Sequence, residues 1–288
     1  MVLKKAIKYM LISTVAFACM NVIVKYLTHV NAFQIVFFRS LSSLFFTLGF
    51  LFKNDVPIFG NNKKLLIIRG LVGVTSMSLF FMSTKYLSIG TAVSMRYLAP
   101  IFAGIFAVIF LKEKIWPLQW LFFLMAFIGV LVLKGLDPQI NTFGLILVLI
   151  ASVTSGLVYI IISKIGKTEH PVVVVNYFMV ISTIIGGVFS IKNWVNPVGI
   201  EWVLLFSLGV FGYIGQVFMT KAFQSGKASI VAPVKYIEVI FTVLFGLLLF
   251  NEIYTFWSLL GITLIIGSLI FNVIYKSRKD SVAVKVSK

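Results

Sequence analysis

Residues 142–163, TFGLILVLIASVTSGLVYIIIS, form a run without a single charged side chain. An α-helix needs about 20 predominantly apolar residues to cross a hydrocarbon core about 30 Å thick. The run therefore predicts a membrane-spanning helix. Similar apolar stretches lie on both sides of it, separated by charged, proline and asparagine residues. The predicted spans are 7–27, 33–52, 65–84, 89–111, 118–134, 142–163, 172–191, 201–224, 228–250 and 256–275.

The composition supports this interpretation. Of the 288 residues, 60% are hydrophobic and 11% are charged, and the mean hydropathy is +1.07. A water-soluble domain carries about a quarter charged residues. Ten spans of about 22 residues occupy about 220 positions, so no soluble domain is expected. The first stretch is too long for a signal-peptide core and lacks a small-residue cleavage site, so we expect it to be retained as the first span.

The chain is strongly basic, with 25 Lys and Arg against 8 Asp and Glu and a net charge of +17. In a soluble protein this charge would favour nucleic acid as a partner. If the N-terminus is cytoplasmic, 17 of these basic residues, Arg69 among them, fall on the cytoplasmic side and four on the other. This positive-inside bias accounts for most of the charge and argues against nucleic acid. We expect a multi-pass protein of the plasma membrane, in a bacterium the inner membrane, with both termini cytoplasmic.

The chain carries few residues for metal, disulfide or nucleotide chemistry. It has one cysteine, Cys19, and two histidines, His29 and His170. A disulfide framework needs paired cysteines, and a metal site needs clustered ligands. The sequence also lacks the Gly-x-x-x-x-Gly-Lys loop that cradles phosphates, so we expect no ATP-binding module. We therefore predict no metal and no cofactor.

The two halves of the chain are similar in sequence. Residues 83–90, STKYLSIG, match residues 219–226, MTKAFQSG, at an offset of 136. Residues 95–100 match residues 234–239 at an offset of 139. Several matches near one offset of about half the chain indicate an internal duplication.

The duplication predicts the topology. We expect one repeat over residues 1–137 and a second over 138–288, which ends in a short basic cytoplasmic tail. Each would hold five spans, and this odd number makes the second repeat enter the membrane in the opposite direction. Inverted repeats are typical of secondary transporters, whose substrate site lies near the midplane. The sequence thus predicts an all-α integral membrane protein with ten transmembrane helices, arranged as two inverted five-helix repeats around a central cavity.

Three stretches resemble the EamA-type branch of the drug/metabolite transporter superfamily. They are FFRS at residues 37–40, IGTAVSMRYLAPIFAGIFAVIFLKEK at 89–114, and GKASIVAPVKYIEVIFTVLFGLLLFNE at 226–252. The resemblance covers essentially the whole chain. It implies a cavity enclosed by the first, third, fourth, sixth, eighth and ninth helices, with the fifth and tenth at the periphery. FFRS and the stretch IIRGLVG at 67–73 are most similar to members that handle small metabolites, such as S-adenosylmethionine or organic cations and anions.

Two basic residues lie deep in aligned spans. A charged side chain at a helix centre costs about 2.5–3.5 kcal/mol, so it usually faces a cavity or a partner. Counting about 1.5 Å per residue places Arg96 and Lys235 within about 5 Å of the midplane. As a pair they can hold a carboxylate or phosphate, and the resemblance adds that phosphate-translocating relatives carry basic residues on these two helices. Alternatively, both serve internal ion pairs with Glu238, which follows Lys235 by three residues.

The other charged residues in or at the ends of the spans have structural interpretations, with a functional alternative for Glu238 and Arg39. Glu238 lies within a span, and it is either a proton-coupling residue or a permanently ionised partner of Lys235. Arg39 is expected to be structural, bound to an internal acid or a backbone carbonyl, rather than in contact with substrate. Lys221 lies near a span end, where its ammonium can reach water. Glu252 ends its span, and we expect it to anchor the structure.

Polar and proline residues complete the candidate site. Tyr97 and Tyr236 follow the two aligned basic residues and can stack on a flat substrate, although packing is the more common role of a tyrosine in a helical bundle. Asn21, Tyr159 and Gln216 are predicted either to line the cavity or to form interhelical hydrogen bonds. Prolines inside spans free backbone carbonyls and allow kinks. The two such residues are Pro100 and Pro233.

These features predict a secondary-active transporter of a small polar organic metabolite, such as an amino acid, a nucleoside-like compound or another carboxylate- or phosphate-bearing solute. The alternative within this class is an exporter of aromatic or cationic metabolites or drugs. A membrane-embedded enzyme is disfavoured because His29 and His170 fall on opposite faces of the membrane. A channel is disfavoured because it would need repeated rings of polar residues along a pore, whereas the candidate residues form one asymmetric charged cluster. The expected partners are the bilayer and a small-molecule substrate, with the chain a monomer or a homodimer.

Overall fold

The computed structural model describes residues 2–111, 116–135, 140–225, 235 and 237–286. Within these ranges all the regular secondary structure is helical. The α-helices are α1 (Val2–Tyr26), α2 (Ala32–Lys53), α3 (Lys63–Ser83), α4 (Ile89–Arg96), α5 (Ala99–Leu111), α6 (Pro117–Gly135), α7 (Thr142–Ile165), α8 (Pro171–Ser190), α9 (Glu201–Ser225), α11 (Ile237–Phe250) and α12 (Phe256–Val286). Two short 3₁₀ helices, η1 (Gly166–Thr168) and η2 (Ile191–Asn193), follow α7 and α8.

Most of the predicted spans are long apolar helices. Seven segments are long and apolar enough to cross a membrane. They are Lys5–Tyr26, Ala32–Lys53, Lys63–Ser83, Ile89–Phe110, Thr142–Thr168, Pro171–Asn193 and Glu201–Ser225. The other three predicted spans coincide with apolar helices that are shorter within the described residues, namely Pro117–Val132, Ile237–Phe250 and Phe256–Asn272.

The fourth predicted span is interrupted. The sequence predicts one helix that kinks at Pro100, whereas the structure has two helices, α4 and α5, separated by residues 97–98. Proline has no N–H to donate to the carbonyl of Arg96, four residues earlier, so a regular α-helix cannot pass unchanged through this point. The end of α4 tightens accordingly, and the Tyr97 N–H lies 3.1 Å from the Ser94 carbonyl oxygen.

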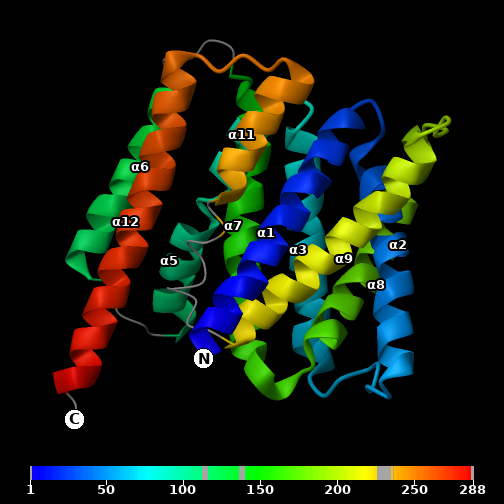
Figure 1. Cartoon of the computed structure of the whole chain (residues 1–288), viewed down its shortest axis with the longest axis horizontal. Coiled ribbons are helices and arrows are strands. Elements are labelled where there is room, and N and C mark those ends of the chain that lie inside the picture. Colours follow the sequence, from blue (N-terminus) through cyan, green and yellow to red (C-terminus); the bar gives the residue numbers. More distant parts are fainter. Residues whose placement is uncertain (1, 112–115, 136–139, 226–234, 236, 287–288) are drawn as a thin grey trace.

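The helices pair between the two halves of the chain. The most extensive interfaces join α1 to α9, α2 to α8, α3 to α7, and α6 to α12, while α4 contacts α11. Figure 1 shows α6 and α12 side by side at one edge of the bundle and α2 and α8 at the opposite edge. Both termini lie at the same end of the bundle.

The polarity of the bundle is that of a membrane protein. Large apolar side chains point outward, for example Leu131, Ile184 and Leu248, which are 68%, 61% and 75% exposed. Serine, threonine, asparagine and arginine side chains are buried inside. In a bilayer the exterior must be apolar, and polar groups must find partners within the bundle. This arrangement places the polar side chains along the axis, where the candidate site lies.

Small residues let α9 approach its neighbours closely. The Ser43 hydroxyl of α2 donates to the Gly209 carbonyl of α9 at 2.8 Å, and the Ser13 hydroxyl of α1 donates to the Gly215 carbonyl at 2.8 Å. A Cβ atom at Gly209 would clash with the Ser42 side chain. Glycine is therefore required where α2 and α9 cross, and its carbonyl becomes an acceptor for the opposite helix.

Candidate functional site

A central cavity lies between α1, α2, α3, α4, α7, α8 and α9, next to Lys235. Its lining includes four basic side chains, from Arg39, Arg69, Arg96 and Lys235. No acidic side chain is among the lining residues that the structure describes. The cavity is therefore strongly cationic, and helices from both halves of the chain form it.

Arg69 lies on the second turn of α3 and is 1% exposed. Its Nη2 donates to the Gln216 Oε1 of α9 at 3.1 Å, and its guanidinium lies over the Phe178 ring at 4.2 Å from the ring centroid. Its Nε and Nη1 atoms are buried and have no hydrogen-bond partner among the described residues. A buried guanidinium with free donors is costly unless an anion or another acceptor satisfies it.

Arg39 lies on α2 and approaches the same aromatic ring, that of Phe178. Its Cζ is 5.7 Å from the centroid of Phe178. Within the described part of the chain its donors reach only methionine sulfurs, Met20 at 3.2 Å and Met77 at 2.7 Å. These partners differ from the acid or carbonyl expected from the sequence. Thioether sulfur is a weak acceptor. Gly212 of α9 makes room for the group, because a Cβ there would lie 2.9 Å from the Arg39 Nε.

Arg96 and Lys235 line the same cavity, with mainly aromatic surroundings. Arg96 ends α4, and its guanidinium lies 4.4 Å from the centroid of the Phe80 ring. The Lys235 ammonium is 3.3 Å from the Tyr159 hydroxyl and 5.5 Å from the centroid of the Phe17 ring. Cation–π contacts of this kind hold a positive charge without neutralising it.

Glu238 lies beside the cavity, near the start of α11, and is 3% exposed. Its carboxylate accepts hydrogen bonds from the Asn21 amide at 2.7 Å and from the Tyr97 hydroxyl at 2.5 Å. The two ion pairs found among the described residues join Lys25 to Glu252 and His29 to Glu201, so Glu238 forms no close ion pair there with Lys235 or Arg96. Glu238 instead bridges α1 and the break between α4 and α5.

The structure thus brings Asn21, Tyr97, Glu238, Tyr159 and Gln216 together around the four basic residues, as the contacts above show. Lys221 is not part of the cavity lining. Its ammonium lies over the rings of Tyr9, at 6.0 Å, and Phe218, at 5.4 Å.

The two predicted kinks have different outcomes. Pro100 lies in the first turn of α5, just after the interruption of the fourth span. Tyr236 and Pro233 lie outside the described residues. The repeat-related tyrosine and proline of the ninth span therefore stay sequence-based predictions.

Arg69 is the site residue that sequence reasoning missed. The predicted span starts at residue 65, four residues before Arg69, so the sequence places Arg69 on the cytoplasmic side, whereas the structure buries it in the lining of the cavity. Arg69 lies six residues into α3, which starts at Lys63, or about 9 Å along the axis. This depth, together with Gly70 directly after Arg69, is the feature of the sequence that could have indicated a buried position.

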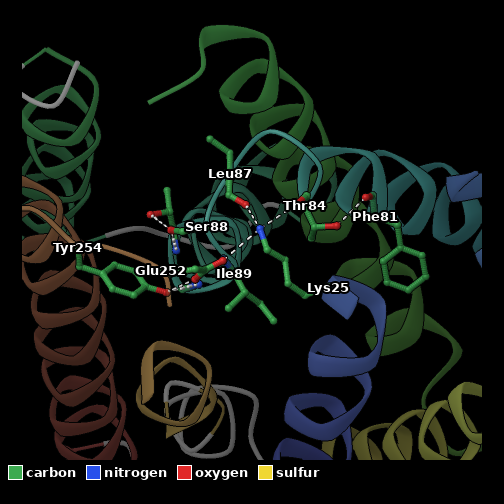
Figure 2. A network of polar contacts seen from close by, with 10 residues as sticks. Lys25, Phe81, Thr84, Leu87, Ser88, Ile89, Glu252 and Tyr254 are labelled. Atoms are coloured by element: carbon green, nitrogen blue, oxygen red, sulfur yellow. Dashed lines mark hydrogen bonds and ion pairs between the residues drawn. The ribbon is translucent and has the colours of Figure 1, made fainter. Parts of the chain in front are cut away.

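The partly buried Lys25 has very different surroundings, shown in Figure 2. Lys25, in the last turn of α1, forms an ion pair with Glu252 at 3.0 Å. Its ammonium also donates to the carbonyls of Thr84 at 3.2 Å and Leu87 at 2.9 Å. We call this contact set the Lys25–Glu252 tie. It lies at the end of the bundle away from the termini (Figure 1).

Glu252 also holds the start of α4. Its carboxylate accepts from the Ile89 N–H at 2.9 Å and from the Tyr254 hydroxyl at 2.6 Å. The same hydroxyl accepts from the Gly90 N–H at 3.2 Å. Burial and the hydrogen bond to Glu252 raise the pKa of Tyr254 above its usual value, so the phenol is protonated at neutral pH. The tie therefore joins α1, α4 and the segment between α11 and α12.

Comparison with known proteins gives a consistent family assignment. The sequence profile of the EamA-like transporter family matches residues 4–134 and 142–274. The human solute carrier family 35 member G1 is 28% identical over 280 residues, which cover 90% of this chain and 76% of that protein. The S-adenosylmethionine uptake transporter of Rickettsia conorii is 29% identical over 278 residues, which cover 95% of this chain and 93% of that protein.

A further relative and a solved structure extend the comparison. The pseudopaline exporter CntI of Pseudomonas aeruginosa is 25% identical over 267 residues, which cover 92% of this chain and 94% of that protein. One crystal structure superposes with a TM-score of 0.67 at 16% identity, covering 93% of this chain and 94% of that chain. At this identity the likeness concerns the fold alone.

Proposed function

The chain belongs to the EamA-like transporter family, and we propose that it is a secondary-active carrier of a small polar organic metabolite. It would work by alternating access, with the two halves rocking around a site near the midplane. The observation that carries the proposal is the cationic central cavity, to which both halves contribute. Buried charges inside a bilayer are costly, and they usually mark a substrate pathway.

We propose ten membrane spans arranged as two inverted repeats, residues 1–137 and 138–288. The helix pairing supports this arrangement. The first span of each half packs against the third span of the other, as α1 with α9 and α7 with α3. The second, fourth and fifth spans pack against their own equivalents. This pattern is unchanged when the two halves are exchanged, as a two-fold relation between repeats requires. The positive-inside bias places both termini in the cytoplasm.

We assign substrate binding to the residues that surround the cavity. Arg96 and Lys235 would hold a carboxylate or phosphate group, and Tyr97 and Tyr159 would contact its organic part. Asn21, Gln216 and Tyr236 complete the predicted set. The break between α4 and α5 supports a site here, because interrupted helices present unpaired backbone groups to transporter substrates. Pro100 and Pro233 would let the two repeat-related helices bend.

Glu238 is the proposed proton-coupling residue. The Asn21 Oδ1 atom is buried without a partner among the described residues, while its Nδ2 donates to Glu238. Turning this amide over would offer Oδ1 as an acceptor for a protonated Glu238. The surroundings therefore suit both protonation states of the carboxyl. Proton coupling is supported if the wild-type flux depends on the pH gradient and the flux of Glu238→Gln does not. It is refuted if the wild-type flux is independent of the pH gradient and the flux of Glu238→Gln is lost.

Counterflow in proteoliposomes tests the carrier proposal. Vesicles are loaded with a pool of unlabelled amino acids, nucleosides and carboxylates, and labelled members of the pool are supplied outside one at a time. A carrier gives a transient overshoot that saturates with concentration, and Arg96→Gln abolishes it, while Lys164→Gln, at an exposed lysine, preserves it. Flux that never saturates, or no exchange with any member of the pool, would contradict the proposal. Overshoot only with aromatic or cationic solutes would favour the alternative substrate class.

A further inference from the structure

We infer that the ligand of the central cavity is an anion with at least two negative charges, a dicarboxylate or a phosphate ester, and that Arg69 is its main binding residue. The inference rests on the proposed function, because it assigns the chemistry of the same site. It adds a residue that the sequence had placed at the membrane surface and narrows the substrate class.

Arg69 has buried hydrogen-bond donors that no described residue satisfies. Its guanidinium is buried in the cavity wall, with Nε and Nη1 unpartnered among the described residues and only Nη2 bound, to Gln216. A guanidinium cannot lose its charge readily, and its planar set of donors matches the paired oxygens of carboxylate and phosphate. Two donors without a partner among the described residues, on a side chain that lines a cavity, are the arrangement that such oxygens satisfy.

Arg39 brings a second buried guanidinium close to the same cavity and the same ring as Arg69. It flanks the Phe178 ring together with Arg69, at 5.7 and 4.2 Å from the ring centroid. Its only hydrogen-bond acceptors in the described part of the chain are the sulfurs of Met20 and Met77. Two guanidinium groups near one ring repel each other in a medium of low dielectric. An anion that reaches both would turn this repulsion into attraction.

The sum of the charges around the central cavity indicates how many negative charges the ligand carries. Arg39, Arg69, Arg96 and Lys235 contribute +4 to the cavity lining, and the neighbouring Glu238 returns −1. The other described carboxylates with polar partners are bound elsewhere. Glu169 accepts from backbone N–H groups, Glu201 bonds His29, and Glu252 pairs with Lys25. A monoanion would leave about +2 uncompensated, whereas a dianion or trianion brings the balance close to neutrality.

A second cavity has the same sign of charge. It lies where the start of α2 meets the ends of α3 and α8, and its lining includes Lys85 and Lys192 but no acidic residue among those described. A cavity lined by one sign of charge raises the local concentration of ions of the opposite sign. Both cavities thus favour anions. A ligand with a net positive charge would instead be repelled by the uncompensated positive charge of the basic residues that line the central cavity.

Thermal unfolding of the purified protein in nanodiscs tests the inference. The probes are acetate, succinate, inorganic phosphate, citrate and choline, at matched pH and ionic strength. Succinate and phosphate distinguish a dicarboxylate from a phosphate ligand. We expect one or both of these dianions to raise the midpoint by several degrees, through mass action on the folded state. Acetate and choline should change it little.

The variants are Arg69→Gln, Arg69→Lys and, as a matched control, Lys164→Gln. Losing a charge-assisted contact should weaken dianion binding at least about tenfold in Arg69→Gln. Arg69→Lys keeps the charge and should retain part of the shift, which also shows that the position tolerates substitution. Lys164→Gln should behave as wild type. Equal dianion shifts in wild type and Arg69→Gln, or a larger shift with choline than with any anion, would overturn the inference.

This experiment is independent of the transport proposal, because binding is measured without a gradient. A dianion that binds through Arg69 but is never exchanged across a vesicle membrane would refute the carrier and support the anion site. Exchange of a cationic solute, with no response to dianions, would support the carrier and refute the anion site.

Discussion

The Lys25–Glu252 tie and the central cavity differ in how the charge of their basic side chains is balanced. In the Lys25–Glu252 tie the ammonium has a carboxylate at 3.0 Å and two backbone carbonyls. In the central cavity Arg69 has one amide oxygen, and Arg39 has two sulfurs. Both clusters lie inside the same helical bundle. The difference indicates that the tie stabilises the fold, whereas the cavity keeps its charge available for a ligand.

The two clusters should respond to mutation with opposite signs. Removing one partner of a buried ion pair leaves an uncompensated charge, whereas removing an uncompensated charge relieves a cost already present. Sites that serve function commonly carry such a cost in stability.

Glu252→Ala should lower the free energy of unfolding by about 3 kcal/mol, because it leaves Lys25 without its counter-charge and the Ile89 N–H without its acceptor. Equilibrium unfolding in detergent micelles, followed by tryptophan fluorescence, measures the change. A loss below about 0.5 kcal/mol, the size typical of an exposed ion pair, would mean that the tie does not stabilise the fold.

Arg69→Met should leave the stability of the ligand-free protein unchanged or raise it by about 1–2 kcal/mol, because an apolar side chain of similar length replaces a buried, partly unsatisfied charge. The same unfolding measurement applies. A decrease as large as that of Glu252→Ala would show that Arg69 has a structural partner and would remove the contrast.

Two double-mutant cycles compare the couplings directly. Lys25→Met combined with Glu252→Gln should destabilise less than the sum of the single changes, with a coupling of about 1 kcal/mol. The matching cycle, Arg39→Met with Arg69→Met, should give a coupling of the opposite sign because like charges are removed. Couplings of the same sign in both cycles would contradict the proposed difference.

Glu238→Gln should change stability by less than about 1 kcal/mol, because glutamine can accept from Tyr97 and donate to the free Oδ1 of Asn21. It removes the negative charge next to the cavity, so dianions should bind a few-fold more tightly. Isothermal titration with succinate and phosphate measures this effect. Weaker dianion binding in the variant would mean that Glu238 contributes to the affinity for the anion and does not reduce it by charge repulsion.

Much of the fold could be predicted from the sequence because apolar length is a strong signal. Seven of the ten apolar stretches coincide with segments long and apolar enough to cross a membrane, and the other three overlap apolar helices that are shorter within the described residues. The break between α4 and α5 was predicted only as a kink at Pro100. Pattern reasoning locates the missing N–H of a proline, but whether the chain bends or ends its helix there depends on the surrounding packing.

The candidate site was predicted less completely. Arg96, Lys235 and Glu238 were singled out by depth, and the structure places them at or beside the central cavity. Arg69 was missed because a basic residue near a span end is ordinarily interfacial. Its contact with Gln216, which lies 147 positions away, depends on how α3 and α9 pack. A single sequence contains no direct record of that packing.

The most direct test of the central claim is counterflow of a labelled dianion, succinate and phosphate in parallel, in proteoliposomes that contain equal amounts of wild type, Arg69→Met or Glu252→Gln. We expect exchange by wild type and by folded Glu252→Gln, and none by Arg69→Met, although Arg69→Met is the more stable of the two variants. Exchange by Arg69→Met at the wild-type rate would contradict the claim.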